Sequence, residues 1–419
     1  MYEISTHEPI AFFKAEILYL DPAVLSDQSA DRDFCILRRV CGTWKMKTPK
    51  TALLCISDTY LPRARMLASF YSSNGDETRI YTPDFSHKSK SAITEREEGV
   101  VYLHHRPYTS NLSWQRLLGH MEFARLVRRE LEEWEPNRIH CLVPANALAS
   151  QSADYKKSHP QTELILDIND LWPESLPMGW AVHTPPAWYW KSLRTRSLDV
   201  ADRIFTECQL FADEIKKQSG RESTVLYWSA STDSTPHPSS PDPEFLDLCY
   251  LGFVNNIIDL DALEDLFERL ARIRPVRLHL IAQGARRQEM ADRLGRHATI
   301  VDHGTIYDPA KRQQILDVCS FGLNIMKKGV QAGLSMKTLD YLQGALPVIN
   351  SLAGDVWQWI EQDGCGINYD RNDPQKTAEA VANMNPKQLM EAKGKARAVY
   401  ERYLSPDAFY AVLEQTIQK

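Results

Sequence analysis

The chain has 419 residues, of which 43% are apolar and 25% are charged. At about 150 residues per domain it has room for two or three domains with buried cores, which excludes a disordered scaffold. Its 49 lysines and arginines are outnumbered by 55 aspartates and glutamates, and the formal net charge of −6 argues against nucleic-acid binding through bulk charge.

Eight cysteines are spread along the chain without a C-x-x-C pair. This spacing favours buried thiols in a reducing cytosol over a zinc site or a disulfide framework. Glu3, Glu8 and Lys14 interrupt the start of the chain, and no run of 18 apolar residues follows, so neither a signal peptide nor a membrane span is indicated. We therefore expect a cytoplasmic protein.

Residues 1–46 show no sustained pattern and are interpreted as an N-terminal appendage or a misassigned start, with Met46 as the working start of the fold. In 47–230, short apolar runs alternate with amphipathic ones, which predicts a first Rossmann-like domain that holds the acceptor side of a site. The clearest helix spans 113–134, with Trp114 and Leu118 on its apolar face and Arg116 on its polar face. The predicted strands are 52–56, 78–81, 100–104, 139–143, 164–168, 204–206 and 224–227.

Residues 231–244 are rich in proline and serine and are predicted to be a linker. The alternation restarts in 245–400, a second Rossmann-like domain, and residues 401–419 are expected to form a helix that packs back on the first domain. The predicted fold is α/β, with two doubly wound parallel sheets facing each other across a cleft and a ligand at the carboxyl ends of the strands. Strands are expected in the second domain at 247–251, 276–282, 299–302, 322–325 and 347–350, and helices at 261–273, 286–294, 309–318 and 336–343.

The stretch AGLSMKTLDYLQGALPVI, residues 332–349, carries the most specific chemistry. Its residues between strand and helix offer free backbone N–H groups to an anion such as a diphosphate. Lys337 falls in the first turn of the helix, where a cation is unfavourable for the helix itself, so we interpret it as serving the bound anion. Asp340 is near enough to the same helix end to accept hydrogen bonds from a ribose.

This stretch resembles the nucleotide-sugar-binding element of GT-B glycosyltransferases, especially glycosyltransferase family four, whose pattern is E-G-F-G-x-x-x-L-E-A-x-A-x-G-x-P-V-I. Leu251–Phe253 resembles the family's first glycine loop, Leu280–Gly284 its second strand and loop, and Gly364–Ile367 its closing turn. LILDINDLWPES, residues 164–175, is similar to enzymes of capsule, exopolysaccharide and O-antigen assembly. The resemblance implies a retaining transferase without metal or other cofactor, a nucleoside diphosphate sugar as donor, and a glycan acceptor that is linked to a polyprenyl diphosphate.

The sequence departs from the family where the diphosphate is held. Ala332 replaces the first of the family's paired acids, and the Arg and Lys that usually follow the first glycine are absent after Gly252. Because a departing diphosphate must be neutralised, we expect Lys327 and Lys328 to assist Lys337, with a solvated basic loop as the alternative. The predicted donor-binding residues are Gly252, Asn255, Asn256, Gly284, Lys327, Lys328, Gly333, Leu334, Ser335, Met336, Lys337 and Asp340.

Asn169 and Asp170 occupy the positions of the family's His-Asp pair, and Asp170 is expected to orient or deprotonate the acceptor hydroxyl. His104 or His105, at a neighbouring strand end, is an alternative, although a histidine there is more often structural. Two D-x-D strings, 31–33 and 259–261, are not interpreted as metal sites, because the first lies in the appendage and the second reads as a capped helix start.

The segment PPAWYWKSLRTR, residues 185–196, combines three aromatic side chains with Lys191, Arg194 and Arg196. This mixture is typical of a surface that lies on an anionic membrane, and packing between the domains is the alternative. We therefore expect a glycosyltransferase of cell-surface polysaccharide synthesis, cytoplasmic and peripheral at the inner face of the membrane, that does not bind nucleic acid. Two alternative functions remain. The first is a non-catalytic GT-B partner of a true transferase, which is favoured because the family's Arg, Lys and first acid are missing. The second is a nucleotide-sugar epimerase, which Ala332 and Asn169 disfavour.

Overall fold

A computed structural model describes residues 48–417, apart from 112, 176–179, 181–182, 231–233 and 331. The interpretation of residues 1–46, with Met46 as the working start of the fold, therefore concerns residues outside the described part of the chain. Cys35 and Cys41 also lie outside it. The other six cysteines are free and buried, as their spacing predicted.

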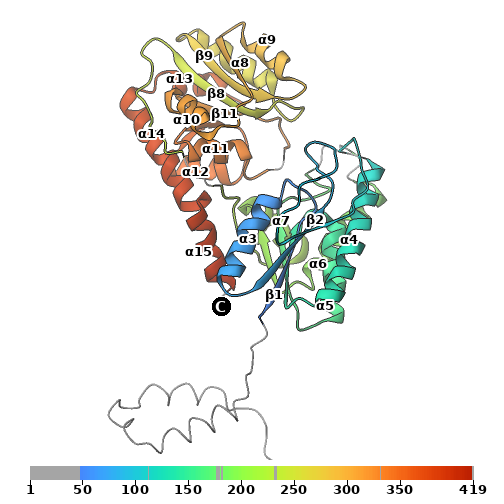
Figure 1. Ribbon diagram of the computed structural model, residues 1–419. Coiled ribbons are helices and arrows are strands. Elements are labelled where there is room, and N and C mark those ends of the chain that lie inside the picture. The colour runs from blue at the N-terminus through green and yellow to red at the C-terminus, as the bar shows by residue number, and fades with distance from the viewer. Residues whose placement is uncertain are drawn as a thin grey trace, which may run out of the picture. The chain divides into compact units, whose positions relative to one another are not determined.

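Two parallel sheets, each covered by helices, build the fold (Figure 1). The first sheet has seven strands in the order β3-β2-β1-β4-β5-β6-β7, and the second has six in the order β10-β9-β8-β11-β12-β13. The first lobe consists of β1 (Lys50–Leu54), α3 (Leu61–Ser73), β2 (Glu77–Pro83), β3 (Val100–Leu103), α4 (Trp114–Trp134), β4 (Arg138–Val143), α5 (Asn146–Ser158), β5 (Glu163–Ile168), α6 (Pro185–Leu198), β6 (Arg203–Thr206), α7 (Gln209–Ser219) and β7 (Thr224–Val225). The predicted fold class is confirmed.

The second lobe repeats the alternation. It consists of β8 (Leu246–Phe253), α8 (Leu260–Ala271), β9 (Val276–Gln283), α9 (Arg287–Leu294), β10 (Thr299–Gly304), α10 (Pro309–Val318), β11 (Phe321–Asn324), α11 (Met336–Gln343), β12 (Val348–Asn350), α12 (Asp355–Asp363), β13 (Gly366–Asn368), α13 (Pro374–Ala382) and α14 (Pro386–Val399). The predicted closing turn 364–367 is shorter in the structure: Gly364 ends α12 in a left-handed conformation, and Gly366 already begins strand β13, where it pairs with Val348 of β12.

Local sequence explains where these elements begin. Strands β1 and β4 are buried after their first residue, as expected of parallel strands with helices on both faces. Ser113 caps α4, since its hydroxyl accepts the Arg116 N–H. Asp259 likewise caps α8 by accepting the Ala262 N–H at 3.1 Å, and its other oxygen pairs with Arg371. The reading of the D-x-D string 259–261 as a helix start is therefore confirmed.

The strand order of each sheet reverses direction at one point. In the first sheet β1 lies between β2 and β4, and in the second β8 lies between β9 and β11. In doubly wound sheets the loops that leave the strands on either side of such a reversal diverge and open a crevice at the carboxyl ends. The loops after β1, β4, β8 and β11 are therefore the places where this architecture favours a ligand.

The chain returns to the first lobe at its C-terminal end, where α15 (Pro406–Ile417) follows a π-helical turn at Tyr400–Leu404. Figure 1 shows α15 beside α3. Phe409 and Leu413 are buried in one apolar cluster with Leu53 of β1 and Phe70 of α3. This helix thus covers part of the first sheet.

A buried ion pair joins α3 to the middle of the first sheet. Arg63 Nε lies 2.7 Å from Asp167 Oδ2 on β5, and Arg63 Nη2 lies 2.9 Å from Asp167 Oδ1. The two side chains are 1% and 0% exposed. Arg63 also donates to the carbonyls of Leu226 and Tyr227. Every charge-bearing atom of this pair is therefore hydrogen-bonded inside the protein, as a buried pair requires.

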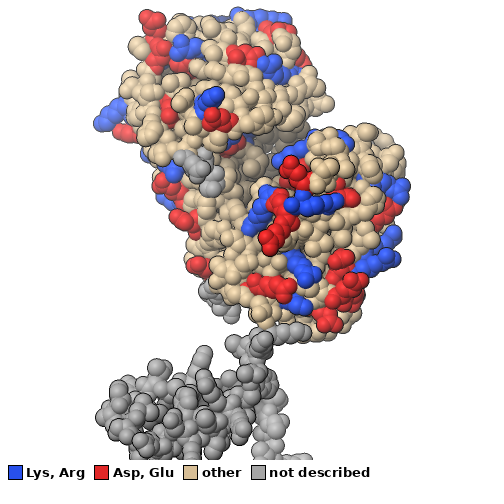
Figure 2. Space-filling view, viewed as in Figure 1, with Lys and Arg blue, Asp and Glu red and all other residues tan. Residues whose placement is uncertain are grey.

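The surface agrees with the nearly balanced composition. On the face drawn in Figure 2, basic and acidic side chains are interspersed and form no large field of one sign. Among the described residues, no helix is both long enough and apolar enough to cross a membrane.

Candidate active site

The predicted donor residues gather at the carboxyl ends of β8 and β11. Gly252, at the end of β8, has φ of +105°, a conformation that favours glycine. A Cβ at this position would lie 3.6 Å from Cε of Lys337, which reaches over from the first turn of α11. Two residues that are far apart in the sequence therefore meet where the strand order reverses.

Lys337 is a partly buried amine in the first turn of α11. Its Nζ lies 5.0 Å from the ring centroid of Tyr250, and among the described residues no carboxylate forms an ion pair with it. Burial lowers the pKa of Lys337 to about 8. A desolvated ammonium beside a glycine turn and a helix N-terminus is suited to bind an anion.

The loop before α11 is fixed by hydrogen bonds. Ser335 Oγ accepts the Thr338 N–H at 3.2 Å and donates to Asn324 Oδ1 at 3.0 Å, so the residue caps the helix and ties it to the end of β11. Leu334 is buried beneath the loop, whereas Met336 is 52% exposed. The residues predicted to surround an anion therefore differ in their roles: Ser335 caps the helix, Leu334 packs beneath the loop, and Met336 faces solvent.

Gly333 has no room for a side chain. A Cβ there would lie 2.6 Å from Cys208 Sγ and 2.7 Å from Asp355 Oδ2. Gly333→Ala is expected to lower the free energy of unfolding by about 1–3 kcal/mol, because backbone or neighbours must shift. Gly394→Ala is the control, since nothing lies within 4 Å of its Cβ position on an exposed part of α14 and alanine favours the helix. Urea unfolding of both variants measures the difference, and equal stabilities would contradict the packing described.

The remaining predicted donor residues lie around this centre. Gly284 packs against Val254: a Cβ at Gly284 would lie 2.7 Å from the Val254 carbonyl oxygen. Asn255 and Asn256 are exposed after β8, and Lys327 is held beside the same loop by its N–H bond to the Ile257 carbonyl. The side chains of Lys327 and Lys328 are exposed.

Asp340 faces an arginine. Its Oδ1 lies 3.6 Å from Arg312, and burial raises its pKa, which Arg312 counteracts. This contact anchors the carboxylate on the second turn of α11.

In the first lobe, Asp170 follows β5 and is held by three donors. It accepts the Leu171 N–H at 2.9 Å, the Trp172 Nε1–H at 2.7 Å and the hydroxyl of Ser175. Burial raises the pKa of Asp170, and the hydrogen bonds from Ser175 and Trp172 oppose this effect. A carboxylate has about four lone-pair positions, so one remains for an acceptor hydroxyl.

The other predicted catalytic residues take different positions. Asn169 is buried, and its amide donates to the Asp167 carbonyl at 2.7 Å, which turns this group toward the sheet. The His104 side chain is 73% exposed, with Nδ1 3.5 Å from Asp84 Oδ2, whereas the neighbouring His105 is buried.

Sequence reasoning missed three groups near Asp170. Glu207 follows β6, the strand next to β5, and accepts the Trp228 Nε1–H at 2.7 Å. Burial and then the Asp170 carboxylate raise its pKa well above the ordinary value. Tyr60, the N-cap residue of α3, has its pKa raised by burial and then by Asp170 and Glu207. The usable signal for Glu207 was a polar side chain directly after a parallel strand.

Arg116 is the third missed group and corrects the predicted faces of α4. It was placed on the polar face, but its guanidinium packs 4.5 Å from the ring centroid of Trp172. Conversely, Trp114 and Leu118, placed on the apolar face, are 70% and 45% exposed. The first turns of α4 extend beyond the sheet, where burial no longer follows the pattern that Val127 and Leu131 obey in its second half.

The interpretation of 185–196 as a basic aromatic surface also needs correction. Arg194 is fully buried, donating to Glu174 and to the Trp172 carbonyl, and Lys191 pairs with Glu174 at 2.9 Å. Both charges therefore serve an internal network. Trp188, Tyr189 and Arg196 remain exposed.

Asp355 connects the two halves of the candidate site. The carboxylate, at the start of α12, accepts the Gln209 N–H at 2.8 Å, the Leu210 N–H at 3.3 Å and the Tyr227 hydroxyl at 2.7 Å. Helix α7 has no side-chain cap of its own, so Asp355 supplies one from the second lobe. The loop of Gly333 and the end of β6 are thereby held next to each other.

No protein-family model matches the chain, and no curated protein matches its sequence. Solved structures do match over most of its length. Sucrose-phosphate synthase from Thermosynechococcus elongatus is similar with a TM-score of 0.64 at 11% identity, over 88% of this chain and 98% of that one. HepE from Anabaena, in complex with UDP and glucose, has a TM-score of 0.61 at 12% identity, and the match covers 88% of this chain and 99% of that one.

WaaG, a glycosyltransferase involved in lipopolysaccharide biosynthesis, has a TM-score of 0.61 at 14% identity. The match covers 87% of this chain and 99% of that one. The fold is GT-B. At these sequence identities, the similarity establishes the fold alone.

Proposed function

We propose that the protein is a glycosyltransferase that moves a sugar from a nucleoside diphosphate sugar to a lipid-linked glycan acceptor in cell-surface polysaccharide synthesis. Lys337 carries the proposal: a desolvated amine with no carboxylate partner in the described part of the chain, set against Gly252 at the reversal point of the second sheet. The HepE structures with UDP and with UDP-glucose support a nucleotide-sugar donor for this fold.

In the proposed reaction, the bond between the anomeric carbon and the diphosphate oxygen breaks, and its electron pair leaves on the diphosphate. Lys337 and the N-terminus of α11 stabilise that charge, so the mechanism needs no metal ion. The acceptor oxygen forms the new bond to the anomeric carbon on the same face that the diphosphate leaves, so the configuration is retained, and its proton passes to Asp170. Burial favours this role, since it raises the pKa of Asp170 toward that of a useful base.

We place the enzyme at the cytoplasmic face of the membrane. Trp188 and Tyr189 on α6 are exposed and suited to the interface between headgroups and acyl chains. Since Arg194 and Lys191 point inward, this contact would depend on aromatic side chains more than on charge.

Lys337→Met is expected to weaken binding of UDP, or of whichever nucleoside diphosphate binds best, by about 30-fold or more, because the anion loses its cation in a partly dry site. Calorimetry with UDP, GDP, ADP and CDP measures this effect. Lys387→Met, which removes an exposed lysine on α14, is the control. In the wild type, affinity should fall up to tenfold per pH unit above about pH 8, where the free amine loses its proton, and the variant should show no such fall.

The results of these binding measurements distinguish the proposed transferase from a non-catalytic partner. Absence of binding by all four nucleotides would overturn the enzyme proposal in favour of a non-catalytic partner. Binding that Lys337→Met leaves unchanged would show that the donor site lies elsewhere.

A further inference from the structure

A cavity of about 550 Å³ lies in the first lobe between the start of α4, the loop after β5 and the start of α6. Its volume is within the range of small-molecule sites. Most of the lining is apolar or aromatic, although the cavity is not part of either sheet's core. The lining includes Trp114, Arg116, Leu117, His120, Trp172, Trp180 and Trp190.

Large apolar side chains remain uncovered at this cavity. Trp114 and Trp180 are 70% and 80% exposed. Exposed tryptophans gathered around a hollow indicate a binding surface, because leaving them in water is unfavourable. Nothing in the described residues covers these two indoles.

Arg116 places one positive charge in this apolar lining. Its Nη1 donates to the Asn111 carbonyl at 2.8 Å, its Nε is buried without a partner, and among the described residues no carboxylate forms an ion pair with it. His120 is 3% exposed, stacks on Trp172, and has a buried Nδ1 without a partner. A desolvated guanidinium and an unpaired imidazole nitrogen beside apolar walls favour an anionic group such as a phosphate.

The cavity wall is connected to the candidate base. Trp172 lines the cavity with its ring and donates from Nε1 to Asp170 Oδ2 at 2.7 Å. Arg116, stacked on the same ring, is near enough to Asp170 to be attracted by its carboxylate. A ligand that fills the cavity and reaches Arg116 therefore brings its polar end to the acceptor side of the site.

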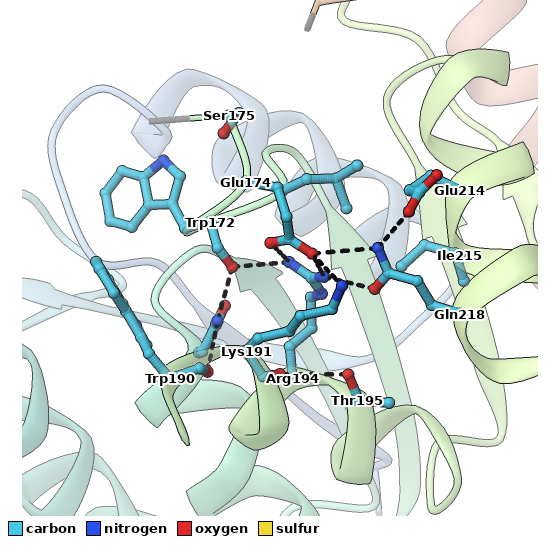
Figure 3. Close-up of polar contacts among 12 residues, drawn as sticks. Trp172, Glu174, Ser175, Trp190, Lys191, Arg194, Thr195, Glu214, Ile215 and Gln218 are labelled. Atoms are coloured by element: carbon cyan, nitrogen blue, oxygen red, sulfur yellow. Dashed lines mark hydrogen bonds and ion pairs between the residues drawn. The ribbon is translucent and has the colours of Figure 1, made fainter. Parts of the chain in front are cut away.

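A hydrogen-bond network fixes this wall before any ligand binds. Figure 3 shows the indoles of Trp172 and Trp190 on one side of the network around Arg194 and Glu174. The Asn146 amide donates to the carbonyls of both tryptophans at 2.9 Å, and Arg194 donates to that of Trp172 at 2.7 Å. The rings meet edge to face with centroids 5.9 Å apart. A wall held in this way binds with a small loss of conformational entropy.

We propose that this cavity, the α4–α6 cavity, binds the apolar chain of a phosphate-bearing lipid, with the phosphate at Arg116 and the head group toward Asp170. The inference rests on the proposed function in treating this amphiphile as the acceptor. A free sugar would need more polar partners than this lining provides, and a flat membrane surface would not need an enclosed cation.

Farnesyl phosphate is the probe, with farnesol and inorganic phosphate as its two halves. Binding is measured by calorimetry and by tryptophan emission, since four indoles line the cavity. Wild type should bind farnesyl phosphate more tightly than either half. Arg116→Gln should weaken farnesyl phosphate about tenfold or more while changing farnesol little, because the charge-assisted contact alone is lost. Leu117→Asp should weaken both by about tenfold or more, because a charge enters the apolar wall.

Trp188→Ala is the matched control, because this exposed tryptophan lies on α6 but outside the lining. It should leave farnesyl phosphate binding unchanged and lower only cosedimentation with phosphatidylcholine and phosphatidylglycerol vesicles. UDP affinity, measured on every variant, reports the proposed function separately. If wild type binds UDP but not farnesyl phosphate, or if Leu117→Asp leaves its binding intact, the cavity assignment is overturned and the transferase proposal stands. Equal losses for Trp188→Ala and Leu117→Asp would assign the patch to membrane adsorption.

Discussion

Replacing Asp170 with asparagine is expected to lower kcat by about 10²- to 10⁴-fold, while the affinity for the donor nucleotide stays unchanged. The amide cannot take the acceptor proton, and its NH₂ group must face donors that the carboxylate now accepts, from Leu171, Trp172 or Ser175. The second effect costs about 1–3 kcal/mol of stability, so the variant has to be shown folded at the assay temperature by circular dichroism.

A pH profile distinguishes a base from a merely structural carboxylate. Because burial raises the pKa of Asp170, activity in the wild type should fall on acidification at a higher pH than an exposed aspartate would give. Ser175→Ala removes a hydrogen bond that lowers this pKa, so the acid limb should move to still higher pH. Asp199→Asn, an exposed acid after α6, should change neither kcat nor the profile. If Ser175→Ala and the wild type showed the same pH profile, this would argue against Asp170 as the base.

Arg63→Met is expected to cost about 3–5 kcal/mol of unfolding free energy, because it leaves the Asp167 carboxylate buried without its partner. The double variant with Asp167→Leu should recover most of this loss, since no buried charge remains. Urea unfolding at neutral pH measures all three proteins. A double variant as unstable as the single one would show that Arg63 acts by packing against Trp228 and Phe409 instead.

The same pair predicts a pH dependence of stability. Burial alone would raise the pKa of Asp167, but Arg63 and His140 outweigh it and hold the pKa at about 2, below the ordinary value. The wild type should therefore keep this contribution above about pH 4 and lose it as the pH falls toward 2. In Arg63→Met the sign reverses: burial raises the pKa, so the variant should lose stability as the pH rises from 4 toward neutrality.

The sheets were predictable because parallel strands with helices on both faces read as short apolar runs. The core of each strand was placed correctly, and helices α10 and α11 begin and end at the predicted residues, with Pro309 in the first turn of α10 and Ser335 as the N-cap of α11. Strand β13 was missed because three half-buried residues carry no such run.

The site was less accessible to sequence reasoning than the fold. Lys337 could be singled out because a cation in the first turn of a helix is unfavourable unless an anion is bound. Arg116 and Arg194 could not, because helical periodicity does not tell where a helix passes the edge of the sheet or which arginine finds a buried acid. Their positions depend on Trp172 and Glu174, which belong to a different part of the chain.

The packing of α15 has a consequence for synthesis of the protein. Phe409 and Leu413 complete a cluster whose other members, among them Leu53 and Phe70, are synthesised before the whole second lobe. The nascent first lobe therefore keeps an uncovered apolar face until the second lobe and α15 have followed, longer than an independent domain of its size would. Chaperone capture during translation should concentrate on this face, and release should coincide with the arrival of α15.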